Sequence, residues 1–196
     1  IGRETDDAWL LKAGLHNLAG VLSRRGKVDE ALPLFEEALA MDRELGNVYG
    51  IELGLQSLAN IYIVREDYER AESLIQEALS VLAALGHQAD LSYARLLHAR
   101  IERARGDYAA ARADLDGALG IARRIDDKIG IVGALIGIGD TCRLEGDAAG
   151  AMQHLQAGIT LAWQIGSRAN VAEGLEVVAG VAVDAKDMRL AASLLG

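Results

Sequence analysis

Arginines gather between residues 95 and 105 of an otherwise acidic chain, where their spacing could bind an anion. Arg100 and Arg103 lie about one helical turn apart, and Arg143 follows at the same place one 40-residue period later. A guanidinium group binds carboxylate and phosphate through paired N–H donors. In the competing interpretation, Asp140 neutralises Arg100 and Arg103 across adjacent helices. The sequence leaves both an anion site and internal ion pairs open.

Other side chains that could catalyse a reaction or hold a metal are scattered. His16, His87, His98 and His154 have no second ligand at the spacing of a metal site. Residues 133–142, GALIGIGDTC, lack the Gly-Lys-Ser/Thr ending of a phosphate-binding loop, so their glycines indicate close helix packing. No serine or cysteine has a histidine and an acid at positions that suit nucleophilic catalysis. We therefore expect no enzyme, no metal and no other cofactor.

The composition disfavours several classes of partner. A net charge of −9 disfavours binding to nucleic acid and to anionic membranes, since both need excess lysine and arginine. No apolar run reaches the ~18 residues of a membrane span, and no charged-then-apolar leader opens the chain. The lone Cys142 cannot form an internal disulfide. We expect a cytoplasmic protein without direct nucleic-acid or membrane contacts.

A period of 40 residues organises the chain, because columns align without an insertion when it is written in rows of that length. Spacings of three and four between apolar residues predict amphipathic helices within each row. Small residues should mark close helix approach, and large apolar residues should fill the space between helices. The small columns are Ala31, Ala71, Ala111, Ala151 and Ala191, then Ala19, Ala59, Ala99, Gly139 and Ala179, then Gly14, Gly54, Ala94, Ala134 and Gly174. The large columns are Leu18, Leu58, Ile138 and Val178, then Phe35, Ile75, Leu115, Leu155 and Leu195.

Stop and cap residues divide each row into two helices. We expect a first helix at 7–25 and its partner at 28–45, with pairs recurring from residues 48, 88, 128 and 168. The tripeptide Arg105-Gly106-Asp107 is therefore a helix stop and a cap, not an adhesion signal. The expected stops are Gly26, Gly106 and Gly146, and the expected caps are Asp67, Asp107, Asp147 and Asp187, with Asn47, Asp127 and Ser167 at the other break.

Residues 55–79, LQSLANIYIVREDYERAESLIQEAL, resemble the tetratricopeptide repeat family. The period is 40 residues where the family usually has 34, and the proline that usually closes the second helix is missing. Both departures resemble the long-helix repeats of kinesin light chains, cell-polarity adaptors and large bacterial signalling ATPases. The matching residues are Leu55, Leu58, Ala59, Tyr62, Tyr68, Ala71, Ile75 and Ala78.

This resemblance implies an all-α fold, a right-handed superhelix of antiparallel helix pairs with about four and three-quarter repeats. We expect one solenoid domain over residues 1–196, with repeats at about 7–46, 47–86, 87–126, 127–166 and an incomplete 167–196. By the family pattern, first helices line a concave groove. The residues expected to bind a ligand there are His16, Gln56, Asn60, Tyr93, Arg100, Arg103, Asp140, Arg143, Glu173 and Glu176.

The first helix of the third repeat breaks the apolar columns. Arg95, His98 and Glu102 stand where other rows are mainly apolar. A buried ionic cluster would be costly. We expect this helix to rotate by about one position, so that Arg95 and Glu102 turn toward the groove. Ala94, Leu97, Ile101 and Ala104 would then pack inward.

The resemblance implies a binding module and not a catalyst. We expect a protein or peptide segment, or a small anionic effector, in the concave groove. The chain begins at Ile1 and ends in RLAASLLG, a run resembling one that follows such repeats in bacterial regulators combining an ATPase with a DNA-binding domain. We therefore expect the sensing or scaffolding part of a larger signalling or transcription-regulatory protein. The alternative is a structural oligomerisation platform without a ligand.

The C-terminal unit should form a homodimer or have a frayed last helix. Residues 188–195 begin a second helix whose apolar residues no later repeat covers, and terminal units of a solenoid need a polar outer face. Light scattering over a dilution series should show a dimer that Leu194→Glu disrupts, or hydrogen exchange should be fast after about residue 186. A strict monomer with a protected last helix would contradict both forms of this prediction.

Overall fold

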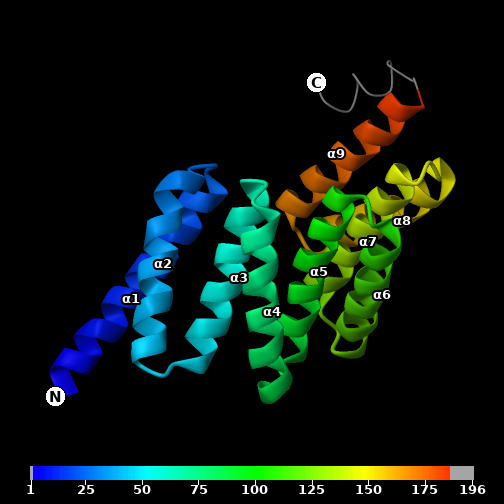
Figure 1. The fold of residues 1–196 in the computed structure, drawn as a ribbon. Coiled ribbons are helices and arrows are strands. Elements are labelled where there is room, and N and C mark those ends of the chain that lie inside the picture. Colours follow the sequence, from blue (N-terminus) through cyan, green and yellow to red (C-terminus); the bar gives the residue numbers. More distant parts are fainter. Residues whose placement is uncertain (1, 186–196) are drawn as a thin grey trace. The chain divides into compact units, whose positions relative to one another are not determined.

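The fold is all-helical over the part of the chain that the structure describes. The structure is a computed structural model that describes residues 2–185, with the side chains of residues 9–82 and 86–185. No strand occurs within residues 2–185. The helices are α1 (Gly2–Arg24), α2 (Val28–Glu44), α3 (Val48–Val64), α4 (Tyr68–Leu85), α5 (Gln88–Arg105), α6 (Tyr108–Arg124), α7 (Lys128–Leu144), α8 (Ala148–Gln164) and α9 (Arg168–Asp184), as Figure 1 shows.

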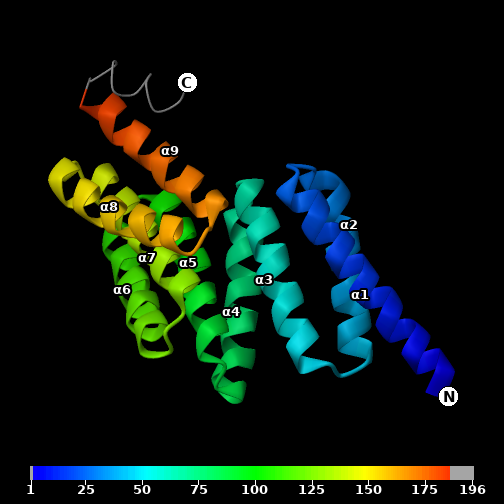
Figure 2. The same cartoon turned by 180° about the vertical axis from the view of Figure 1, so that it is seen from behind.

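The helices form two compact units, each built from antiparallel pairs. Unit 1 is Ile1–Gly86 and contains α1 to α4; unit 2 is His87–Gly196 and contains α5 to α9. In unit 1, α1 pairs with α2 and α3 pairs with α4, and α2 also packs against α3. In unit 2, α5 pairs with α6 and α7 with α8, while α9 packs on α8 and α7 (Figures 1 and 2). The all-α prediction is confirmed, and the single domain stays a prediction.

Helix positions follow the predicted period. Second helices begin at Val28, Tyr68, Tyr108 and Ala148, each 40 residues after the last. The helix predicted from Met188 lies outside the described residues. The predicted start of the first helix is wrong, because α1 begins at Gly2 instead of Asp7. Residues 3–6 contain no helix breaker, and their acidic side chains stabilise a helix N-terminus through its dipole.

Most of the predicted stops and caps are confirmed. Gly26, Gly106 and Gly146 have left-handed backbones, with φ of 74°, 82° and 83°. The carboxylates of Asp67, Asp107 and Asp147 accept the backbone N–H three residues later at 3.3, 3.0 and 2.9 Å. Asp127 caps α7 by accepting the backbone N–H of Ile129, two residues later, at 3.0 Å, and Asp187 lies outside the described residues.

Two predicted caps are wrong. Neither Asn47 nor Ser167 makes a side-chain hydrogen bond to its helix N-terminus. The amide of Asn47 donates instead to the carboxylate of Asp42 at 2.5 Å. Because Asp42 is buried, its carboxylate would be costly to leave without a hydrogen-bond donor, whereas the exposed start of α3 can bond to water.

The predicted small and large columns make the cores of both units. Ala31, Ala71, Ala111 and Ala151 are fully buried, and Phe35, Ile75, Leu115 and Leu155 are at most 4% exposed. Leu18 departs from its column, since it is 51% exposed while Leu58 and Ile138 are 3% and 1% exposed. Among the described helices, α3 packs against α2 and α7 packs against α6, but none takes the equivalent place against the Leu18 face of α1.

Glu66 offers a test of the turn geometry. It has a φ of 59° at the position where Gly26 and Gly106 occur in other repeats. Glu66→Gly should raise the free energy of unfolding by about 0.5–1 kcal/mol, since relief of left-handed strain exceeds the entropy that glycine adds to the unfolded chain. Urea unfolding followed by circular dichroism measures the change. Glu37→Gly, at an exposed position inside α2, should instead lower that free energy by about 1 kcal/mol. A loss in both variants would show that the turn is unstrained.

Candidate functional site

A cavity of about 290 Å³ opens on unit 2. Its walls come from α5, α7 and α9, with Leu115 from α6 and Asp127 from the turn before α7. These are the first helices of three successive repeats, as the groove prediction requires. Its apolar side chains are Leu96, Leu97, Leu115, Ile129, Ile136 and Val177, and its polar ones are Tyr93, Arg100, Arg103, Asp127, Asp140, Asn170 and Glu173. This lining suits a ligand that carries both apolar and charged groups.

Two glycines of α7 that line the cavity let side chains of α5 and α6 pack closely against α7. A Cβ atom on Gly133 would lie 3.0 Å from Cδ1 of Leu96. A Cβ atom on Gly137 would lie 2.5 Å from Cδ2 of Leu115 and 3.2 Å from Nη1 of Arg103. Any side chain at these positions would push its neighbours aside. The glycine-rich run 133–142 therefore serves close packing, as the sequence indicates.

Arg103, in the last turn of α5, is the central cation of the cavity. Its side chain is only 14% exposed. Its Nε lies 3.4 Å from Oδ2 of Asp140, and its Nη1 donates to the carbonyl oxygen of Gly137 at 3.4 Å. Both contacts are long compared with charge-assisted hydrogen bonds, which are usually about 2.7–2.9 Å. Burial lowers the pKa of Arg103, and Asp140 opposes this lowering. These two long contacts thus offset only part of the free-energy cost of burying the guanidinium charge.

Asp140 forms ion pairs with two arginines, and the second of these, Arg143, continues the ion pairs to α9. Its Oδ1 accepts from Nε of Arg143 at 3.0 Å, and Nη1 of Arg143 donates to Asp184 on α9 at 2.8 Å. Burial disfavours the charge of Arg143, but its hydrogen bonds to Asp184 and Asp140 outweigh burial and raise its pKa. The internal ion pairs are therefore present for Asp140 with Arg103 and Arg143.

Tyr93, Arg100 and Glu173 are further polar residues of the cavity lining. Burial raises the pKa of Tyr93; Arg100 opposes this and Glu173 adds to it. The residue as a whole is still 43% exposed, so its ring remains accessible. An apolar or cationic ligand group can pack on that ring.

Five of the ten expected site residues line this cavity: Tyr93, Arg100, Arg103, Asp140 and Glu173. Arg143 lies next to it through Asp140, whereas Glu176 is exposed and outside the lining. The sequence interpretation missed Asn170 and Asp127. Asn170 lies one turn before Glu173 on the same helix face, a spacing that could have revealed it.

The three expected site residues of unit 1 stay predictions. His16 packs edge-on against the Phe35 ring, with ring centroids 5.1 Å apart. Gln56 is buried and its amide donates to Glu52 at 3.3 Å. Asn60 is half-buried and already has an interaction partner.

The predicted rotation of the first helix of the third repeat is correct in part. Ala94, Leu97 and Ile101 are buried, whereas Ala104 is exposed.

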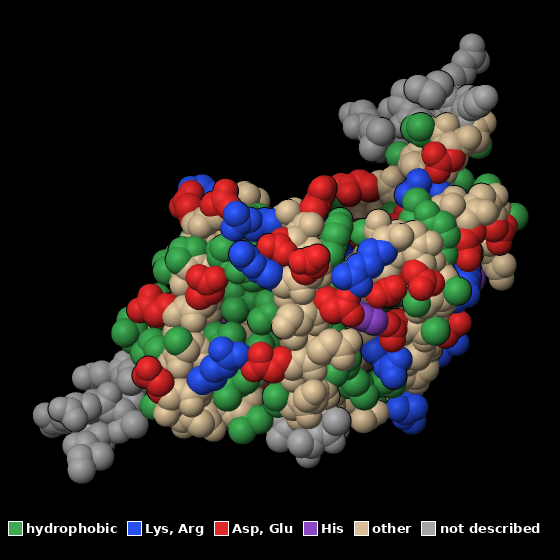
Figure 3. All heavy atoms as spheres, viewed as in Figure 1, with side chains coloured by type: hydrophobic (Ala, Val, Ile, Leu, Met, Phe, Trp, Pro, Cys, Tyr) green, Lys and Arg blue, Asp and Glu red, His purple; other side chains and the backbone are tan. Residues whose placement is uncertain are grey.

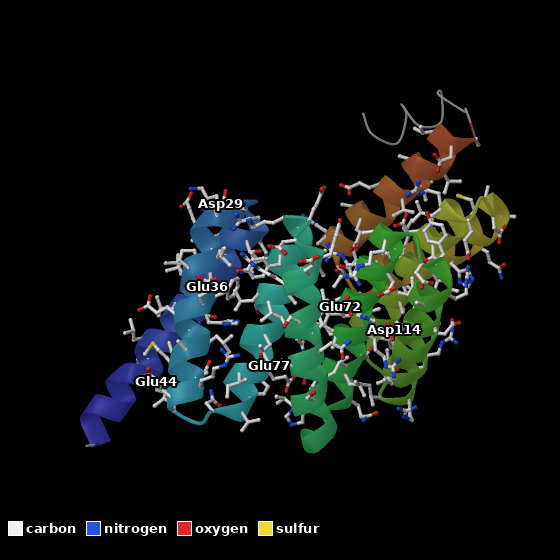
Figure 4. The ribbon with its side chains drawn as sticks, in the orientation of Figure 1. Asp29, Glu36, Glu44, Glu72, Glu77 and Asp114 are labelled. Carbon is white, nitrogen blue, oxygen red and sulfur yellow. The ribbon has the colours of Figure 1, made fainter. Side chains whose placement is uncertain are left out.

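The predicted turn of Arg95 and Glu102 toward the groove is wrong, because these residues join an ionic cluster that His98 of α5 and Asp114 of α6 complete. Nη1 of Arg95 donates to Asp114 at 2.9 Å, and Nδ1 of His98 lies 2.5 Å from the other oxygen of Asp114. Nε2 of His98 lies 3.6 Å from Glu102. Figure 4 shows Asp114 on α6. Because the four side chains keep 12% to 39% exposure, the cluster avoids the full cost of burying charge.

Known proteins share the repeat and the helical fold described above. A sequence model described as tetratricopeptide repeat matches residues 12–84. A Signal Transduction ATPase with Numerous Domains from Pyrococcus horikoshii, which has a tetratricopeptide repeat sensor, aligns with 93% of this chain at a TM-score of 0.70 and 17% identity. The chain has the tetratricopeptide-repeat fold. Kinesin light chain repeats from Podosopora anserina align with 93% of this chain and 90% of their own length, at a TM-score of 0.63 and 16% identity.

Two larger proteins extend well beyond the aligned region. A Rap protein complexed with competence and sporulation factor aligns with 96% of this tetratricopeptide-repeat chain at a TM-score of 0.81 and 14% identity. The chain spans about half of that protein, 52%, and 28% of the Pyrococcus ATPase. No curated protein sequence matches the chain. Within residues 2–185, no helix combines the length and the apolar character needed to cross a bilayer.

Acid should destabilise this tetratricopeptide-repeat chain partly through His16. Burial lowers the pKa of His16; Asp42 opposes this and Lys12 adds to it. His16 of the unfolded chain is therefore protonated near pH 6.5, whereas His16 of the folded chain is protonated only at a lower pH. The free energy of unfolding consequently decreases as the pH falls below about 6.5. Urea unfolding between pH 5 and 8 should show a smaller pH dependence for His16→Phe than for the natural chain. Equal slopes would contradict this role.

Proposed function

We propose that unit 2 binds a protein or peptide segment through an acidic group that enters the cavity and pairs with Arg103. The observation that carries this proposal is the weak compensation of Arg103. Its guanidinium is mostly buried, lines the cavity and contacts both Asp140 and the carbonyl oxygen of Gly137 at the long distance of 3.4 Å. A carboxylate in the cavity would provide short, charge-assisted hydrogen bonds that these groups do not provide.

The remaining lining supports a peptide-like ligand. Leu96 and Ile136 offer apolar contact beside Arg103, and Asn170 offers an amide that can bond a peptide backbone. A volume of about 290 Å³ is near the lower end for small-molecule pockets, so it suits one or two side chains of a longer segment. A small anionic effector satisfies the same groups.

The structural relatives support binding in this kind of fold. The Rap protein was solved in complex with competence and sporulation factor, and the Pyrococcus ATPase uses its repeats as a sensor. We extend these roles to this chain as the sensing or scaffolding part of a larger signalling protein. The charged cavity favours this role over an oligomerisation platform, because a platform needs no buried, weakly paired arginine.

Binding should depend on Arg103 and on salt. Peptides selected from a random displayed library on the immobilised chain should be enriched in Asp, Glu or a free C-terminal carboxylate. By calorimetry, Arg103→Ala should weaken binding of such a peptide by roughly 1.5–3 kcal/mol, the range for a hydrogen bond to a charged group. Added salt should weaken binding further.

Arg123→Ala is the matched control. It removes the same charge from an exposed position on α6 outside the cavity. Its effect should stay within ~0.5 kcal/mol, as for surface substitutions. Equal affinity in Arg103→Ala and the natural chain would leave Arg103 as an internal partner of Asp140 and would refute the proposal.

A further inference from the structure

The cavity of unit 2 changes the sign of its charge along its length. Its cations, Arg100 and Arg103, lie in the last two turns of α5, whereas Tyr93 lies near the start of the same helix. Glu173 of α9 lines the cavity too, and it occupies the same place in its row as Tyr93, two periods later. An acidic group bound at Arg103 therefore leaves the Tyr93 end of the cavity to another part of the ligand.

Gly133 keeps the space between Tyr93 and Glu173 open. It occupies the same place in the middle row, on α7, and it also lines the cavity. Because glycine has no side chain, none projects from this place on α7 between the ring and the carboxylate. Burial raises the pKa of Tyr93, Arg100 opposes the rise, and Glu173 adds to it. The phenol therefore senses the carboxylate across this space.

Glu173 is the carboxylate of the cavity that is open to a ligand. Asp127 caps the N-terminus of α7, and Asp140 pairs with Arg143 and Arg103. Among the side chains that the structure describes, none forms a hydrogen bond or an ion pair with Glu173. Figure 3, by contrast, shows acidic and basic side chains intermixed on the face of unit 2 that it draws, where ion pairs join α5 to α6. A basic group of a ligand can thus pair with Glu173 without displacing a described partner.

Within the described residues, the chain twice holds a cation with both an aromatic ring and a carboxylate. These sites are Lys12 with Trp9 and Asp42, and Arg70 with Tyr62 and Asp67. The ring centroid lies 4.7 Å from the ammonium nitrogen in the first site and 5.5 Å from the guanidinium carbon in the second. Tyr93 and Glu173 provide the same two groups, and no described lysine or arginine lies over the Tyr93 ring.

We propose that the segment bound through Arg103 also carries a lysine or arginine, which enters between the ring of Tyr93 and the carboxylate of Glu173. This assignment rests on the function proposed above, since it adds a second group to the same bound segment. Tyr93 lies ten residues before Arg103 on α5, a rise of about 15 Å. An extended segment covers about 3.3–3.6 Å per residue, so its basic and acidic residues lie about four positions apart.

Selection of peptides from a random displayed library on the immobilised chain tests this pattern of charges. Selected peptides should carry a lysine or arginine about four positions from the acidic residue. The same selection on Glu173→Gln should retain the acidic residue and lose the preference for a basic one. If the natural chain selects acidic peptides without a preferred basic residue, this inference fails and the proposed function stands. Selected peptides without an acidic residue would overturn both.

Calorimetry with one selected peptide measures the contribution of Glu173. Replacement of the basic residue of the peptide by glutamine should weaken binding to the natural chain about fivefold, because a cation–π contact and an exposed ion pair are lost. The same replacement should matter less than about twofold for Glu173→Gln and for Tyr93→Leu, whereas Tyr93→Phe keeps the ring and should behave like the natural chain.

Asp116→Asn is the matched control, since it removes one negative charge from an exposed position on α6 outside the cavity lining. It should retain the roughly fivefold effect of the basic residue. An equal loss in the natural chain and in Glu173→Gln would overturn the proposal, because the basic residue of the peptide would then bind elsewhere.

Discussion

Close approach of neighbouring helices at small residues is the constraint on which the rest of the structure depends. Ala31, Ala71, Ala111 and Ala151 have no exposed surface, and each recurs at the same place in its repeat. Where the approach is closer still, the chain has glycine: a Cβ on Gly139 would lie 2.7 Å from Cγ of Leu155. Interiors packed to this density have little room for larger groups, so these columns fix helix spacing throughout each unit.

The same constraint allows charge to be buried. In unit 1, Asp42 is 4% exposed and accepts from Lys12 and Asn47. A Cβ on Gly50 would lie 2.1 Å from Oδ1 of Asp42, so the missing side chain leaves room for this carboxylate. A buried pair of this kind adds little net stability against apolar residues, but removal of one partner is costly. Its contribution is to fix how α1, α2 and the start of α3 meet.

Unit 2 uses buried charge differently. Asp140 bonds to Arg143 more closely than it bonds to Arg103, at 2.9 Å against 3.4 Å. Arg103 consequently lies beside the cavity with its charge only partly compensated. Gly137 contributes in two ways, since its missing Cβ leaves room for Arg103 and its carbonyl oxygen accepts from that residue. The repeat thus builds a rigid frame from alanine and leucine columns and places variable charges on the first helices. Such a frame can acquire a binding site without a change of fold.

The sequence by itself determined the helices, their period and most of their ends. These features depend on local chemistry: the apolar spacing of each helix, glycine at left-handed turns, and aspartate beside unpaired backbone N–H groups. It also identified Arg103 and Asp140 as neighbours, because Asp140 is one period after Arg100, which lies one turn before Arg103 on the adjacent first helix.

Tertiary structure decided which side chains pair and which face is open. Arg95 turned to Asp114 instead of the groove, and Asn47 turned to Asp42 instead of its helix end. Leu18 has the same place in its row as Leu58, yet Leu18 is exposed while Leu58 is buried on α3, which packs against α2. Each of these outcomes depends on groups distant in the chain that compete for one partner or one surface. A residue's type and period do not specify that competition, because its result depends on distances and burial that exist only once the helices are packed.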